Sequence, residues 1–382
     1  MKVYRHWLKV CRTMATIKPF RALRPEPSYS GKLKDLLEAP ARVRPETEER
    51  QMAAYAEIRN RIDLLKAQGN LHLDEQAGIY IYEIVQPGYR QTGIWTLTAV
   101  QDYVEGRIKL HEQTLADSER RICNYRRHTG LEGSPIVLTY PSDETINRII
   151  GEACNAHPEA ATNRILKIED PVTVNELIKA FKGIEESYLA DGHHRLAGTV
   201  RNNPDSWISS LYIASDQLRI IDYHRVVIPQ LPINKTYLLQ RLAEICEIKQ
   251  DFKRRSKGSF ELYVDGIWYE LQLNNSEALD VVSLQEQILA PLFGITDPRT
   301  DSRLKCIGGE SADLEIDSLL KLHPEAIAFK LQPMSVDDLM AAAAKGQLLP
   351  PKSTWVDPKV PYGLLMYQHS FEGKDISALH YD

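Results

Sequence analysis

The sequence predicts an α+β fold, because apolar strand patterns that pair as hairpins are mixed with stretches of helical spacing. The clearest hairpin covers residues 259–273 and turns at Asp265-Gly266, a dipeptide typical of two-residue hairpin turns. A second pair of strands is predicted at 78–85 and 93–100, around a Pro-Gly loop. With 382 residues, 43% of them hydrophobic, the chain is long enough to bury a large core.

The remaining elements follow in chain order. Residues 18–45 are rich in proline and charge, which predicts a mostly irregular segment. Helical spacing predicts helices at 46–68, 112–128, 172–182, 238–247, 284–292, 316–322 and 336–344. Apolar and β-branched runs predict strands at 135–140, 187–190, 207–213, 220–228, 326–331 and 363–369. The pattern of predicted strands and helices changes after Pro229 and Pro232, so we predict two domains, 14–230 and 231–382. We expect the second domain to pack against the functional site of the first.

Composition excludes several classes of function. A formal net charge of −5 argues against a general nucleic-acid binder, whose footprint is usually a basic surface. The five cysteines are scattered and contain no CxxC pair, which indicates reduced thiols in the cytoplasm and argues against a zinc site. No apolar stretch approaches the length of a membrane span. We therefore expect a cytoplasmic protein with a small-molecule partner and no nucleic-acid or membrane partner.

The most informative motif is Asp191-Gly-His-His-Arg195, between a predicted strand and a predicted helix start. The first turn of a helix offers unpaired N–H groups and the positive end of the helix dipole, which suit an anion. Gly192 allows close backbone approach, and Arg195 can bind phosphate or carboxylate oxygens in a bidentate manner. The alternative is a capped helix start, with Asp191 as N-cap and a solvated histidine pair.

Three further blocks carry candidate site residues. In His111-Glu112, the carboxylate can act as a general base or ligate Mg²⁺, or Glu112 simply favours a helix start. His224 and Arg225 lie in an apolar strand, where they either alternate on an edge strand or both face a polar pocket. The Pro-flanked residues 350–359 place an ammonium and two hydroxyls side by side, as a loop over nucleotide phosphates or as a plain connection.

The motif at 191–195 resembles the signature of the ParB/sulfiredoxin-like fold, in particular of its free serine kinases, whose loop-to-helix turn receives the phosphates of a nucleotide. The chain is also similar over nearly its whole length to a long bacterial family of unknown function. The shared blocks are 17–25, 110–114, 223–226, 297–301 and 350–359. Because the family pattern begins just after Met14, we expect translation to start there and residues 1–13 to be a disordered extension.

The resemblance implies a small-molecule kinase that uses ATP or ADP with Mg²⁺ and phosphorylates the hydroxyl of L-serine to give O-phosphoserine. The implied catalytic residues are Glu112, Asp191 and His193, of which Glu112 and Asp191 also bind Mg²⁺. The implied nucleotide-binding residues are Gly192, His193, His194, Arg195, Lys352, Ser353 and Thr354. The implied substrate-binding residues are His111, His224 and Arg225.

Two other classes of function share this type of turn. A ParB-like nucleotide-binding switch or interaction module would bind nucleotide without phosphorylating a metabolite, although the chain has no evident basic helix-turn-helix segment. A sulfiredoxin-like reductase requires a nucleophilic cysteine where this chain has His193. The chain departs from the family at residues 36–44, which lack the Tyr-Asp-Val-like block of other members. If the aspartate of that block belongs to the site in other members, the departure implies an altered or lost activity.

Overall fold

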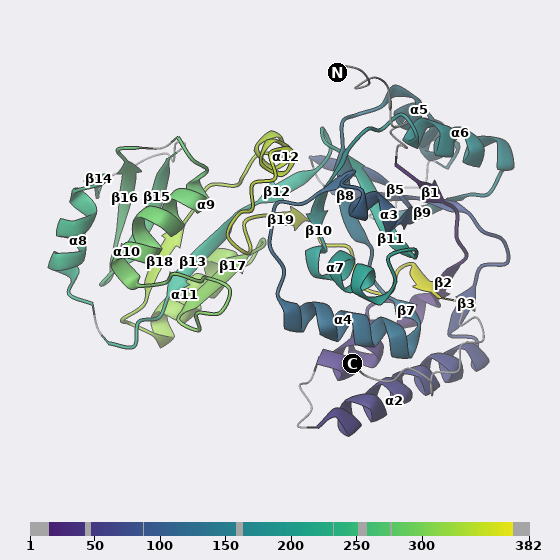
Figure 1. Ribbon diagram of the computed structural model, residues 1–382, viewed down its shortest axis with the longest axis horizontal. Coiled ribbons are helices and arrows are strands. Elements are labelled where there is room, and N and C mark those ends of the chain that lie inside the picture. Colours follow the sequence, from purple (N-terminus) through teal and green to yellow (C-terminus); the bar gives the residue numbers. More distant parts are fainter. Residues whose placement is uncertain are drawn as a thin grey trace, which may run out of the picture.

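The computed structural model describes residues 15–42, 47–86, 88–157, 163–231, 233–250, 258–275 and 277–369, so the predicted extension 1–13 and Met14 lie outside the described residues. The fold is α+β, as predicted. Figure 1 shows two lobes, which we call the N-terminal lobe (residues 15–221 and 335–369) and the C-terminal lobe (residues 223–331). Among the described residues, no helix combines the length and apolar character needed to cross a bilayer.

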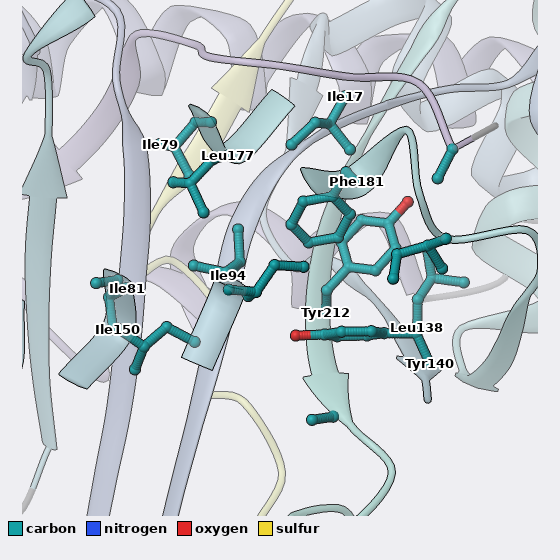
Figure 2. Close-up of a cluster of buried hydrophobic side chains, with 14 of the residues drawn as sticks. Ile17, Ile79, Ile81, Ile94, Leu138, Tyr140, Ile150, Leu177, Phe181 and Tyr212 are labelled. Carbon is teal, nitrogen blue, oxygen red and sulfur yellow. The ribbon is translucent and has the colours of Figure 1, made fainter. Parts of the chain in front are cut away.

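An eight-stranded mixed sheet forms the centre of the N-terminal lobe. Its order is β6 (Ile108–Lys109), β10 (Ser187–Asp191), β8 (Ile136–Tyr140), β11 (Trp207–Ala214), β5 (Tyr89–Ala99), β4 (Ile79–Gln86) and β9 (Asn163–Ile168), with β1 (Ile17–Lys18) beside β5. Successive side chains of a strand point to opposite faces, so Ile79 and Ile81 enter one core, shown in Figure 2, while Tyr80 and Tyr82 enter another. Both faces are covered, which explains the nearly continuous apolar runs of these strands.

Helices of the N-terminal lobe begin and end at recognisable signals. The Thr47 side chain accepts a hydrogen bond from Arg50 N at the start of α2 (Glu48–Ala67). Gly130, with φ of 66°, ends α4 (Ala116–Thr129). The others are α1 (Ala39–Arg42), α3 (Gln101–Val104), α5 (Glu144–Ala156), α6 (Pro171–Phe181), α7 (His193–Asn202) and α12 (Val336–Ala344). The helix predicted at 112–128 thus begins at residue 116, and α5 was not predicted.

Two small sheets join distant parts of the chain. One has the order β3 (Leu71–Leu73), β2 (Ala22–Pro25), β20 (Met366–Gln368) and β7 (Leu131–Glu132). The other pairs β12 (Arg219–Ile221) with β19 (Trp355–Asp357). Residues 18–45, predicted as mostly irregular, contain β2, α1 and a π-helical turn at Lys34–Glu38, so this prediction was wrong in part.

The C-terminal lobe is built on a six-stranded sheet, which appears on the left of Figure 1. Its order is β14 (Cys246–Lys249), β16 (Ile267–Leu273), β15 (Ser259–Val264), β18 (Ile327–Lys330), β13 (Tyr223–Val227) and β17 (Leu304–Gly308). Its helices are α8 (Lys235–Ala243), α9 (Asp280–Ser283), α10 (Ala290–Phe293) and α11 (Ala312–Leu322), with a π-helical segment at Leu284–Leu289. The hairpin at Asp265-Gly266 is confirmed as β15 and β16.

Two sequence predictions in this region were wrong. The single strand predicted at 220–228 is two strands, β12 and β13, which belong to different sheets. The helix predicted at 238–247 ends at Ala243, and its last residues enter β14. The division at 230/231 stays a prediction: β13 already belongs to the second sheet, and β19 and β20 pair with strands of the N-terminal lobe.

Candidate functional site

The pairing of β6 with β10 brings two of the predicted blocks together. The two strands are parallel, with Ser187 opposite Ile108 and Tyr188 opposite Lys109. Residues that follow two parallel neighbours emerge at the same edge of the sheet. The imidazole rings of His111 and His193 accordingly meet edge to face, with their centroids 4.6 Å apart. The blocks at 111–112 and 191–195 therefore form one site.

The turn between β10 and α7 depends on Gly192. This residue has φ of 100°, in the left-handed region, and is the N-cap of α7. A Cβ atom built on Gly192 would lie 2.9 Å from Ile136 Cγ2 and 2.9 Å from Arg195 Nη2. No side chain caps the helix, so the alternative in which Asp191 is the N-cap was wrong. The first turn of α7 therefore keeps N–H groups without a side-chain acceptor.

Asp191 is held by two cations. Arg195 Nη2 donates to Asp191 Oδ2 at 2.6 Å, and Lys359 Nζ donates to Asp191 Oδ1 at 2.7 Å. Burial raises the pKa of this carboxyl, but the charges of Arg195 and Lys359 outweigh burial and hold the pKa well below its usual range. Lys359, whose ammonium also lies 4.8 Å from the centre of the Trp355 ring, was not predicted as a site residue. Its only signal was its place in the block 350–359.

Arg195 lies between two cavities. The larger, of about 430 Å³, is lined by charged and apolar residues that include Lys34, Asp191, Arg195 and Lys359. The smaller, of about 150 Å³, also has Arg195 in its wall, and Tyr362 lines both cavities. Arg195 Nε is buried and has no hydrogen-bond partner among the described residues. Because Arg195 lines both cavities, its guanidinium is placed beside any anion that binds in either of them.

Glu112 is buried at the other end of the site. Its Oε2 accepts a hydrogen bond from Lys352 N at 3.2 Å, and its backbone forms a parallel bridge with Leu349. Burial raises the pKa of Glu112, and the positive charge of Lys352 opposes this only in part. Tyr223, which was not predicted as a site residue, is close enough to Asp191 and Glu112 for their charges to add to burial in raising its pKa.

Burial lowers the pKa of each histidine of the site, which favours the neutral imidazole. Burial lowers the pKa of His111 to about 4, and its Nε2 is 3.1 Å from the Thr354 hydroxyl. Burial and the neighbouring His111 hold the pKa of His193 well below its ordinary value. His194 is half-buried, its pKa is lowered by burial, and its Nε2 accepts a hydrogen bond from Leu115 N at 3.1 Å. The alternative of a solvated histidine pair was therefore wrong.

The strand β13 presents His224 and Arg225, and both are buried, so the alternative of one inward and one outward side chain was wrong. His224 Nδ1 accepts a hydrogen bond from Leu331 N at 3.2 Å. Arg225 Nη2 donates to the carbonyls of Pro351 and Lys352 at 3.0 and 3.1 Å. The guanidinium of Arg225 thus anchors the loop that carries Lys352.

The loop at 350–354 lies against the site. Lys352 is exposed and has φ of 60°, so the backbone turns sharply at this point. The Ser353 hydroxyl donates to the Pro350 carbonyl within the loop, whereas the Thr354 hydroxyl faces His111. Of the three residues in this loop that were predicted to bind nucleotide, Lys352 and Thr354 therefore border the buried end of the site, and Ser353 bonds to its own loop.

Comparisons with solved structures gave several distant likenesses. A free serine kinase variant in complex with ADP has a TM-score of 0.43 and 14% identity, and the match covers 73% of this chain and 92% of that chain. A C-terminally truncated SbnI from Staphylococcus aureus has a TM-score of 0.43 and 13% identity, with coverage of 74% and 91%. A conserved hypothetical protein from Pyrococcus furiosus has a TM-score of 0.40 and 14% identity, with coverage of 71% and 94%. At these values the likenesses decide nothing about activity.

A comparison with curated proteins gave no match. A family model, by contrast, matches residues 36–288, which include His111, Glu112, the motif at 191–195 and β13. This match extends over well more than half of the chain. The chain therefore belongs to the family described as "Protein of unknown function (DUF1015)".

Proposed function

We propose that this protein is a nucleotide-dependent phosphotransferase that phosphorylates the hydroxyl of a small molecule, with L-serine as acceptor and O-phosphoserine as product. One observation carries the proposal: Arg195 lines a cavity of about 430 Å³ beside the uncapped first turn of α7. An uncapped helix start together with an arginine is suited to the phosphates of ATP or ADP.

The donor end of the site is organised by Asp191. Its carboxylate orients Arg195 and Lys359 through hydrogen bonds of 2.6 and 2.7 Å, and it leaves other donors of both cations for a ligand. The Arg195 guanidinium would bind phosphate oxygens, and Lys359 would neutralise the charge that develops on the transferred group. Because both carboxylate oxygens of Asp191 are engaged, we assign it this positioning role rather than that of a metal ligand.

The acceptor end is formed by Glu112 and Lys352. Glu112 is buried, and no bond to its Oε1 is recorded among the described residues, so its carboxylate fits a divalent cation such as Mg²⁺. A bound cation would neutralise phosphate charge there. Arg225 is committed to the carbonyls of the 350–354 loop, so we assign Lys352 to the carboxylate of the acceptor. Phosphoryl transfer depends mainly on such positioning and charge neutralisation.

We place this activity in the cytoplasm, where ATP and ADP are present and thiols are kept reduced. Cys123, Cys154, Cys246 and Cys306 are all unpaired, and the first three of these are buried. Such a set of thiols suits a reducing compartment.

The test is a product assay on the purified full chain with Mg²⁺, ATP or ADP, and a panel of hydroxyl-bearing amino acids, read by mass spectrometry. Arg195→Ala removes charge-assisted hydrogen bonds worth about 1.5–3 kcal/mol, so nucleotide affinity should fall by about 10- to 150-fold. Arg195→Lys should retain part of it. Arg201→Ala is the matched control, because Arg201 is exposed near the other end of the same helix.

Each result of this assay has a definite meaning. O-phosphoserine that depends on Arg195 and not on Arg201 supports the proposal. Nucleotide binding without any phosphorylated acceptor favours a nucleotide-binding switch instead. If neither ATP nor ADP binds, measured by calorimetry, both functions are refuted.

A further inference from the structure

Three buried side chains at the end of β6 and the start of α7 form a group of which the proposed phosphotransferase reaction uses only Glu112. His111, Glu112 and His193 each offer one ligand atom, and these atoms all lie within 4.8 Å of one another. Two of the three are imidazoles, which Mg²⁺ rarely uses. We propose that His111, Glu112 and His193 bind one divalent transition-metal ion, Zn²⁺ in the first instance, through two nitrogens and one carboxylate oxygen.

The spacing of the three ligand atoms suits a single ion. For any three atoms that lie within 4.8 Å of one another, there is a point no more than about 2.8 Å from each of them. Zinc bonds to histidine nitrogen and carboxylate oxygen are about 2.0–2.2 Å long. The side chains therefore need to close by less than about 1 Å, which small rotations about their side-chain bonds provide.

A second observation points independently to a ligand at this place. His193 is only 6% exposed, and its buried Nε2 has no hydrogen-bond partner among the described residues. Buried polar atoms are almost always paired, because an unpaired one loses its hydration without compensation. A metal ion satisfies such a nitrogen, and the neutral imidazole is the form that binds metals.

The surrounding structure holds the three ligands in place. The His111 carbonyl accepts a hydrogen bond from Leu349 N at 2.7 Å, and Glu112 Oε2 accepts one from Lys352 N at 3.2 Å. His111 Nε2 is 3.1 Å from the Thr354 hydroxyl, which orients the ring, and we assign the buried Nδ1 as its ligand atom. Metal-bound histidines almost always carry such a partner on their other nitrogen. Thr354 is therefore a positioning residue of this site.

The chemistry of the donor set selects the metal. Imidazole nitrogen suits Zn²⁺ and other late divalent transition metals, whereas Mg²⁺ and Ca²⁺ prefer oxygen ligands throughout. Two histidines and one glutamate are the protein ligands of one class of catalytic zinc sites, which have three such ligands where structural sites have four. The absence of a CxxC pair argues only against cysteine-ligated zinc. Glu112 belongs to both proposals, but Zn²⁺ binding by the resting protein can be measured without nucleotide or acceptor.

The test uses the full chain, stripped of metal with a chelator and dialysed into metal-free buffer. Zn²⁺ is then added in competition with a chelator of known affinity, and Co²⁺ is added to a parallel sample for its visible absorption. We expect one ion per chain, and a large excess of Mg²⁺ should not displace it. Glu112→Gln and His193→Gln should each weaken Zn²⁺ binding by more than about 100-fold, and Thr354→Val by about 10- to 100-fold, because losing a ligand costs more than losing its supporting partner.

The matched control is His72→Gln. His72 Nε2 lies 2.6 Å from a Glu26 oxygen on the surface, so this variant removes a histidine from an exposed His–Glu pair and should leave Zn²⁺ affinity unchanged. Circular dichroism of the metal-free variants checks folding, and Thr354→Val keeps the test valid if His193→Gln does not fold. The proposal is overturned if the wild type binds no Zn²⁺, or if Glu112→Gln and Thr354→Val keep the wild-type affinity and Co²⁺ spectrum. Loss of Zn²⁺ binding in His72→Gln would also overturn it.

Discussion

Replacing Gly192 with alanine should destabilise the protein by more than its backbone conformation alone requires. With φ of 100°, any Cβ at this position is strained by about 1–2 kcal/mol. The new methyl group would also lie 2.9 Å from Ile136 Cγ2 in the core and 2.9 Å from Arg195 Nη2, which is held by Asp191. Crowding of a packed core costs about 1–3 kcal/mol. The free energy of unfolding should therefore fall by about 2–5 kcal/mol.

The matched control for this prediction is Gly106→Ala. Gly106 has φ of 75°, but a Cβ there meets no atom within 4 Å, so this variant carries the backbone strain without the crowding. Urea unfolding followed by circular dichroism measures both. We expect about 1–2 kcal/mol of destabilisation for Gly106→Ala. If the two variants lose equal free energy within about 0.5 kcal/mol, the argument from the packing around Gly192 is refuted.

Three further predictions concern stability. Burial raises the pKa of Glu132, but Arg126, His369 and the backbone of Ser209 together outweigh burial and keep that pKa below its usual value. The ionised Glu132 therefore stabilises the fold fully above the pKa of the unfolded chain, about 4.3, and this stabilisation is lost as the pH falls through the lower pKa of the folded state. Glu132→Gln should therefore flatten the acid limb of a curve of unfolding free energy against pH, and an unchanged limb would contradict this. Gly151→Ala, in open space inside α5, should stabilise by about 1 kcal/mol in urea unfolding, and a loss of stability would count against the helix geometry. Arg225→Met leaves the partly buried carbonyls of Pro351 and Lys352 without their donor and should destabilise by about 2–5 kcal/mol, whereas a loss below about 1 kcal/mol would show that the anchor is unimportant.

Local signals in the sequence were enough to predict much of the fold. The hairpin at Asp265-Gly266 could be recognised because its turn chemistry and alternation are both local. The helix α5 was missed although its signals are present, since Asp143 caps it and Ile146, Ile149 and Ile150 follow helical spacing. The split of the run 220–228 into β12 and β13 could not be predicted, because it depends on which distant strands pair with each half.

The candidate site shows the same division. The strand–turn–helix around Gly192 was predicted from local chemistry, and the structure has it. The contact between His111 and His193 was not predicted, because it depends on the pairing of β10 with a strand of only two residues. Lys359 reaches Asp191 across 168 positions of sequence, since β19 pairs with β12 and brings the chain back to the N-terminal lobe. No local pattern contains that information.

The position of β20 has a consequence for how the chain is made and divided. Residues 366–368 lie between β2 and β7 and form hydrogen bonds with both, so this sheet is complete only after the last part of the described chain has been synthesised. A fragment cut at the borders of the family match, 36–288, would lose β2 and β20 together and also the residues Thr354 and Lys359. Such a fragment would leave β3 and β7 as unpaired edges, which are prone to aggregation. Expression trials should therefore keep residues 15–369 together.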